Sequence, residues 1–203
     1  AYIVKPGMMF EAAGVKPGDK IAVCAKNTAH WAVSFLASNA YRAVTVTILS
    51  DFHPDSVSHL VNHSESSVLF VDREIWDKLE KGAMPLLKLV VNVDDFALIY
   101  ASDAKVKAAF EGMDKAYAEK YPQGVDKDQF SLPKDNLDEL AVINYTSGTT
   151  SAPKGVMLTY GNLSSSILFG HENIPVMPDD KIVSMLPMAH IYGMVYEFLY
   201  PLA

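Results

Sequence analysis

The chain of 203 residues is 50% hydrophobic and 20% charged, a composition typical of a soluble globular protein with a sizeable core. Its formal net charge is −7, and an acidic chain without a basic cluster is a poor candidate for nucleic-acid binding. No signal peptide is visible, and no uninterrupted apolar run is long enough to cross a bilayer. The single cysteine, Cys24, lies in an apolar run and is predicted to be a buried core residue, which fits a reducing, cytoplasmic compartment.

Strands and helices are predicted to alternate through the first part of the chain. Apolar and β-branched runs indicate strands, and amphipathic stretches with capping residues indicate helices. The predicted strands are 20–25, 44–49, 67–71 and 86–93, and the predicted helices are 28–41, 54–62 and 104–120. This alternation is typical of an α/β fold with a layered sheet and flanking helices.

The second part of the chain begins with a polar connector at 121–138 and continues with further alternation. The predicted elements are a buried strand at 140–145, a short strand at 156–158, a helix at 162–173, a strand at 181–185 and a helix from 188 onward. The chain begins with Ala rather than Met and stops within an apolar run, so we expect a fragment of a longer protein.

The segment between the strands at 140–145 and 156–158 has the composition of a loop that holds a polyphosphate. Residues 145–156 are YTSGTTSAPKGV, in which Gly148 lets the backbone approach an anion and Lys154 supplies a compact positive charge. Hydroxyl groups that can surround phosphate oxygens belong to Thr146, Ser147, Thr149 and Thr150. The spacing differs from the common P-loop, G-x-x-x-x-G-K-S/T. A flexible linker is the simple alternative, although linkers seldom lie between two apolar strands.

This loop resembles the phosphate-binding signature of the adenylate-forming enzymes, which include acyl- and aryl-CoA synthetases, peptide-synthetase adenylation domains and firefly-type luciferases. The family pattern is close to Y/F-T-S-G-T-T-G-x-P-K-G-V, and this chain departs from it at Ser151, where the family usually has Gly. If that position needs a positive φ, the serine is strained by roughly 1 kcal/mol, which would either weaken nucleotide binding or give the loop a different shape at that point. Two earlier runs, GVKPGDKIAVCAKNTAHW at 14–31 and SVLFVD at 67–72, resemble family segments as well, so the resemblance covers nearly the whole chain.

A second motif at 186–193, LPMAHIYG, resembles the family segment that lies near the acyl or aryl group of the substrate. The resemblance implies that His190 lies beside the substrate carboxylate and the forming adenylate as a catalytic residue. It also implies that Tyr192, Gly193 and Tyr196 line the pocket for the organic tail. A hydrogen-bonded structural histidine is the alternative for His190. Amino-acid-activating domains usually carry F-D-x-S here, whereas this motif and the following MVYEFLYPL are more similar to long-chain acyl-CoA synthetases.

The resemblance implies ATP-dependent activation of a carboxylic acid, in particular a long-chain fatty acid, with ATP, Mg²⁺ and coenzyme A. A fatty-acid substrate is also compatible with peripheral contact with a membrane. Residues 1–203 would then form an incomplete N-terminal domain without the C-terminal domain, so we expect this chain alone to be inactive. The alternatives are a non-catalytic nucleotide-binding module and an aryl-CoA ligase or luciferase-like enzyme.

Two histidines, His59 and His63, are four residues apart on the helix predicted at 54–62 and its end. Such a pair can bind a metal, but the nearby acidic residues show no ligand spacing and no HExxH motif is present. We interpret both as surface residues and predict no metal-ligating residues.

Overall fold

The computed structural model describes residues 3–126, 136–146, 153–177 and 179–203. Its centre is a seven-stranded sheet in the order β5-β4-β3-β1-β2-β6-β7. The strands are β1 (Lys20–Cys24), β2 (Val44–Thr47), β3 (Val68–Val71), β4 (Leu89–Asn92), β5 (Leu98–Ala101), β6 (Leu140–Thr146) and β7 (Lys154–Thr159). The five inner strands are parallel, whereas the edge strands β5 and β7 pair antiparallel with their neighbours.

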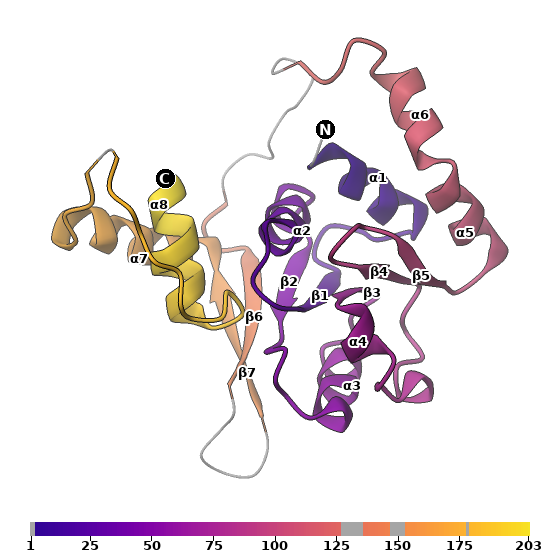
Figure 1. Cartoon of the computed structure of the whole chain (residues 1–203), viewed down its shortest axis with the longest axis horizontal. Coiled ribbons are helices and arrows are strands. Elements are labelled where there is room, and N and C mark those ends of the chain that lie inside the picture. The colour runs from indigo at the N-terminus through magenta and orange to yellow at the C-terminus, as the bar shows by residue number, and fades with distance from the viewer. Residues whose placement is uncertain (1–2, 127–135, 147–152, 178) are drawn as a thin grey trace.

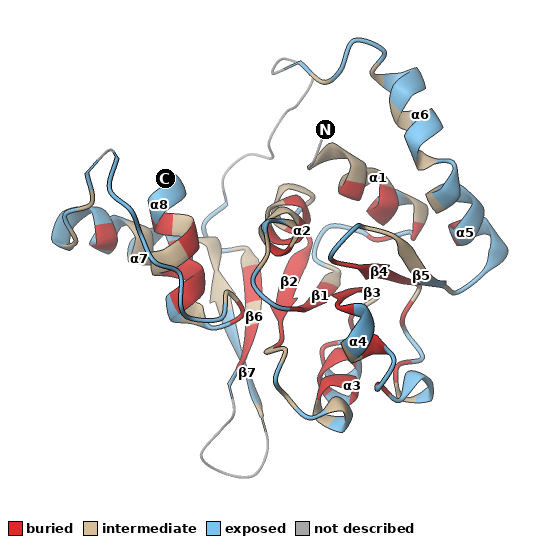
Figure 2. Cartoon of the chain, in the orientation of Figure 1, coloured by how far each residue is buried: buried red, intermediate tan, exposed pale blue. Residues whose placement is uncertain are grey.

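Helices cover both faces of the sheet (Figure 1). One face packs against α1 (Val4–Ala12), α2 (Ala29–Ala40), α5 (Ala104–Glu111), α7 (Tyr160–Asn173) and the π-helix η3 (Gly193–Leu199). The other face packs against α3 (Pro54–His63) and α4 (Arg73–Trp76). The remaining helices are η1 (Lys81–Ala83), α6 (Met113–Lys120) and α8 (Tyr200–Leu202). Strands covered on both faces are apolar throughout, which explains the uninterrupted apolar runs of β1, β3 and β4, whose buried positions are red in Figure 2.

Local signals explain where several helices begin. The Thr28 side chain accepts a hydrogen bond from the backbone N–H of Trp31 and so caps α2. Pro54 occupies the first turn of α3, where its missing N–H costs nothing. Thr159 and Asn162 form a reciprocal capping box at the start of α7. These residues therefore fix where α2, α3 and α7 begin.

The predicted α/β class and most predicted elements are confirmed, with adjusted bounds and some additional elements. The predicted helix at 104–120 is divided at Gly112 into α5 and α6, and the strand predicted at 86–93 is limited to β4. The sequence pattern did not predict α1, α4, η1 or β5.

The prediction of a strand at 181–185 is wrong. This segment has no regular secondary structure, and Val183 and Met185 are 71% and 80% exposed. Its apolar residues pair with no strand of the described sheet, so hydrophobicity alone was a misleading signal here. The helix predicted from 188 begins at Ile191, after a turn through His190, and continues as η3. Within the described residues, no helix combines the length and apolar character needed to cross a membrane.

Cys24 lies at the end of β1 and is completely buried, as the sequence predicts. Burial, assisted by the nearby carboxylates of Asp72 and Asp51, raises the pKa of this thiol to about 12. Because the thiolate is the reactive form, the folded protein should protect Cys24 from alkylation.

We therefore expect a thiol reagent at pH 8 to leave Cys24 unmodified in the folded chain and to modify it fully in denaturant. The raised pKa keeps the thiol protonated at this pH, and burial blocks access. Mass spectrometry before and after unfolding measures the modified fraction. Rapid modification of the folded chain would contradict the burial of this residue.

Candidate functional site

The described ends of the predicted phosphate segment, and the residues just before His190, lie near the carboxyl end of the parallel strand β6. β2 and β3 lie on opposite sides of β1. The connection from β1 to β2 therefore runs one way across the sheet, and the connection from β2 to β3 runs the other way. In open α/β sheets, ligands bind outside the carboxyl ends of the strands at such a switch point. The end of β6 and the segment before His190 meet here from different parts of the chain, through the hydrogen bond between Asn144 and Ala189.

Strands β6 and β7 form the stem of the predicted phosphate loop. Thr146 pairs with Lys154 at the end of this antiparallel ladder, one step beyond the pair of Tyr145 with Gly155. Both Thr146 and Lys154 are exposed. The structure therefore brings a hydroxyl and an ammonium group to the base of the loop. The other predicted phosphate-binding residues, and the departure from the family pattern, lie outside the described residues: Ser147, Gly148, Thr149, Thr150 and Ser151.

The segment that carries His190 is held by the side chain of Asn27, which follows β1. The Asn27 Nδ2 donates to the Leu186 carbonyl at 2.8 Å, and its Oδ1 accepts from the Met188 N–H at 2.7 Å. One amide side chain thus satisfies a donor and an acceptor of an irregular backbone segment. The sequence pattern suggested Asn27 or Thr28 as a helix cap. Thr28 is the cap, and Asn27 has this different role.

A second amide joins the two predicted segments directly. Asn144 lies on β6, two residues before Thr146, and is 3% exposed. Its Nδ2 donates to the Thr47 Oγ1 at 2.7 Å and to the Ala189 carbonyl at 2.6 Å. The strand that leads into the phosphate loop is therefore tied to the residue that precedes His190. Sequence reasoning missed Asn144, although a polar residue inside the apolar run LAVINY was a visible signal.

His190 is exposed at the turn before the helix that begins at Ile191. Its Nδ1 lies 3.2 Å from the Tyr192 backbone N–H and accepts a hydrogen bond from it. An Nδ1 acceptor in neutral imidazole places the proton on Nε2. In this tautomer Nε2–H is the donor of the ring, and the role of His190 beside a substrate carboxylate stays a prediction.

The tail-binding residues predicted next to His190 lie together, but they differ in exposure. The rings of Tyr192 and Tyr196 are 4.8 Å apart between centroids, and Tyr192 is 52% exposed. Gly193 is buried, and a Cβ there would lie 2.6 Å from the Pro187 carbonyl oxygen. Packing against this carbonyl is thus a sufficient reason for glycine at 193. The pocket role assigned to these three residues stays a prediction.

One buried carboxylate lies at the same edge of the sheet. Asp72 follows β3, is 9% exposed, and accepts a hydrogen bond from the Lys26 backbone N–H at 3.0 Å. Burial raises the pKa of Asp72, and the hydrogen bond from Lys26 partly opposes that rise. Among the residues that the structure describes, no group of three or more His, Cys, Asp or Glu residues is placed to hold a metal ion.

The interpretation of His59 and His63 as surface residues agrees with their exposure, but His63 has a partner that the sequence did not indicate. Its Nδ1 lies 2.6 Å from the Tyr145 hydroxyl.

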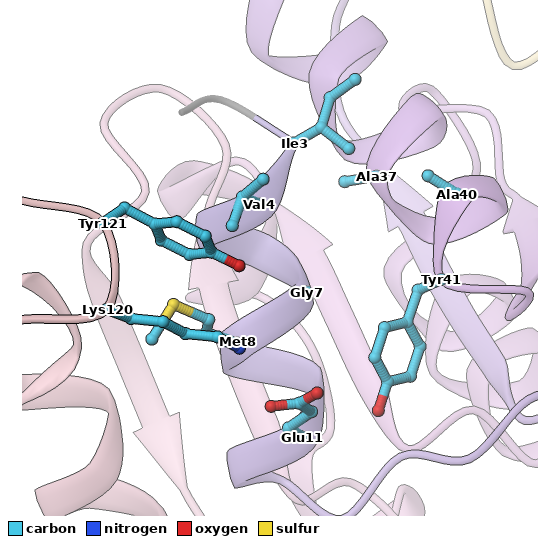
Figure 3. A pocket seen from close by; sticks show the side chains of 10 residues that line it. All are labelled: Ile3, Val4, Gly7, Met8, Glu11, Ala37, Ala40, Tyr41, Lys120 and Tyr121. Carbon is cyan, nitrogen blue, oxygen red and sulfur yellow. The ribbon is translucent and has the colours of Figure 1, made fainter. Parts of the chain in front are cut away.

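A hollow of about 140 Å³ between α1, α2 and the end of α6 is lined by residues such as Met8, Tyr41 and Tyr121 (Figure 3). None of the predicted site residues lines it.

We expect Gly193→Ala to lower the free energy of unfolding by about 1–3 kcal/mol, because the new methyl group must displace the Pro187 carbonyl. Gly82→Ala is the matched control, since a Cβ there meets nothing within 4 Å, and it should change stability by less than about 0.5 kcal/mol. Chemical denaturation followed by circular dichroism measures both. Equal stability of the two variants would show that Gly193 is not required by packing.

The chain is similar in fold to solved structures. The anthranilate CoA ligase bound to anthranoyl-AMP matches 98% of this chain and 36% of its own chain, with a TM-score of 0.80 and 18% identity. The ATP-bound MatB from Rhodopseudomonas palustris matches 99% of this chain and 37% of its own, with a TM-score of 0.72 and 21% identity. At these identities the likeness shows the fold.

Curated relatives are similar over most of the chain. Peroxisomal long chain acyl-CoA synthetase 7 of Arabidopsis thaliana is 31% identical over 192 residues, which covers 92% of this chain and 26% of the relative. Human long-chain-fatty-acid–CoA ligase 1 is 31% identical over 191 residues, which covers 89% of this chain and 27% of the relative. This chain therefore spans between a quarter and a third of the length of these relatives. The family model described as AMP-binding enzyme matches residues 5–203, and the chain belongs to this family of adenylate-forming enzymes.

Proposed function

We propose that the protein to which this chain belongs activates a long-chain fatty acid with ATP and transfers the acyl group to coenzyme A. The observation that carries this proposal is the pairing of Thr146 with Lys154 at the base of the family's phosphate signature, joined through Asn144 to the segment before His190. The substrate class is supported by the long-chain acyl-CoA synthetases to which the chain is similar.

The proposed reaction has two steps. A carboxylate oxygen of the acid attacks the α-phosphorus of ATP, and the bond to the β-phosphate oxygen breaks to release pyrophosphate. The thiol of coenzyme A then attacks the acyl carbon, loses its proton to solvent or base, and displaces AMP. The first step needs in-line positioning and neutralisation of phosphate charge more than covalent help from the protein.

The residues of the loop would supply this positioning. The Lys154 ammonium and the Thr146 hydroxyl would contact the β- and γ-phosphates, together with Ser147, Gly148, Thr149 and Thr150. Magnesium would arrive with ATP as part of the substrate and share the charge of the phosphates. Because the Lys154 ammonium is exposed, it can contact a phosphate without first breaking a buried interaction.

His190 and its neighbours would hold the acid. The Nε2–H of His190 would donate to an oxygen of the substrate carboxylate or of the forming adenylate, while its Nδ1 stays bonded to the Tyr192 N–H. The apolar faces of Tyr192 and Tyr196 would contact the tail, with Gly193 giving the backbone room to turn.

Replacement of the loop cation tests the nucleotide site. In the longest natural form of the protein, we expect Lys154→Met to weaken ATP binding about tenfold to a hundredfold, because a hydrogen bond from a charged group is lost. Lys107→Met is the control, since Lys107 is exposed on α5 beside Glu111 and far from the loop in the chain. Isothermal titration calorimetry measures both affinities. Similar ATP affinity in the two variants would remove the phosphate loop from the proposal.

Acid-dependent exchange of pyrophosphate with ATP tests the activity. We expect exchange from the longer protein with long-chain fatty acids, and much less with coumarate-like acids. We expect no useful exchange from residues 1–203 alone, because they span less than a third of the length of the relatives. Robust exchange by the 203-residue chain would contradict the second expectation. A longer protein that binds ATP but shows no exchange with any acid would be a non-catalytic nucleotide-binding module.

A further inference from the structure

The strands β6 and β7 form the stem of the predicted phosphate loop, at the lateral edge of the sheet. β7 is the last strand of the described sheet and pairs with β6 (Figure 1). Its residues from Lys154 to Met157 are exposed. Beyond Asn144, the last residue of β6 that pairs with β2, the stem is a two-stranded ribbon, and such a ribbon has few contacts that hold its tip in place. The position of Thr146 and Lys154 therefore depends on how β6 is fastened to the rest of the molecule.

Tyr145 fastens the stem on the face of the sheet covered by α3. Its side chain is 3% exposed and packs in the hydrophobic cluster that contains Val57 and Leu60 of α3. On the neighbouring strand, a Cβ at Gly155 would lie 3.2 Å from Cε1 and 3.3 Å from Cζ of the Tyr145 ring. The ring thus lies between α3 and β7, one residue before Thr146.

The hydroxyl of this tyrosine reaches the end of α3. It lies 2.6 Å from Nδ1 of His63, the last residue of that helix and 82 residues earlier in the chain. Burial raises the pKa of Tyr145, so its phenol keeps its proton at neutral pH. In the neutral Nε2–H tautomer of His63, the phenol donates and Nδ1 accepts.

We propose that His63 is a positioning residue for the phosphate loop. By holding the Tyr145 hydroxyl, it fixes the end of β6 against α3 and so fixes Thr146 and Lys154 where a polyphosphate is to be received. This inference rests on the proposed function. His63 acts through Tyr145, and the exposure of its own ring means that little buried surface depends on it.

Because His63 is exposed, its replacement should change the stability of the fold little, and a double-mutant cycle can then measure its effect on ATP binding. In the longest natural form of the protein, His63→Phe and Tyr145→Phe should each weaken ATP binding about twofold to tenfold, the effect of one neutral hydrogen bond. The double variant should be no weaker than the single variants, because both remove the same bond. His63→Asn, which returns an acceptor near the position of Nδ1, should recover part of the affinity. His59→Phe, one turn earlier on α3 and exposed, is the control and should bind ATP normally.

Amide hydrogen exchange at Thr146 and Gly155 gives a readout that needs no nucleotide. We expect faster exchange in His63→Phe and Tyr145→Phe, with thermal unfolding that changes little in His63→Phe. Unchanged exchange and unchanged ATP affinity in these variants, in a protein that binds ATP, would overturn the role of His63. Losses that add in the double variant would also overturn it, because the residues would then act separately. An unmodified protein that binds no ATP would instead overturn the proposed function itself.

Discussion

The side-chain amide of Asn144 is the contact on which the arrangement of the site depends. It is buried and donates both to the Thr47 hydroxyl on β2 and to the Ala189 carbonyl. Loss of this amide would leave a buried acceptor without its partner, at a cost of about 1–3 kcal/mol. Because Asn144 lies on the strand that leads into the predicted phosphate loop, the same contact ties the end of that strand to the residue before His190.

Backbone groups before His190 have side-chain amides as hydrogen-bond partners, whereas those of the sheet pair with a neighbouring strand. The segment from Leu186 to Ala189 approaches the carboxyl ends of the strands without adding a strand to them. Asn27 and Asn144 instead satisfy its backbone groups at three positions. An irregular segment held in this way can turn sharply at His190 and present the ring outward, which a paired strand with alternating side chains could not do as freely.

Local patterns predicted what is local in this fold. The apolar runs of β1 and β3 and the cap at Thr28 follow from neighbouring residues, so their positions were predictable. The contacts that build the site are not local, since Asn27 bonds to Leu186 across 159 residues and His63 to Tyr145 across 82. Their partners cannot be deduced from spacing in one sequence. The exposed apolar run at 181–185 failed as a strand for the same reason, because strand formation requires a partner that the pattern does not name.

The two motifs combine residues that answer to different physical demands. Thr146 and Lys154 are exposed at the base of the predicted loop, so packing does not dictate which side chains stand there, and their proposed ligand would. Gly155 and Gly193 lie where a Cβ would be crowded, by the Ile143 side chain and the Tyr145 ring in one case and by the Pro187 carbonyl in the other. Loss of a residue of the first kind should weaken binding with the fold intact, whereas loss of the second kind disturbs the backbone that presents the first. Both kinds of residue stand side by side in the same motifs, and only the packing around each position distinguishes them.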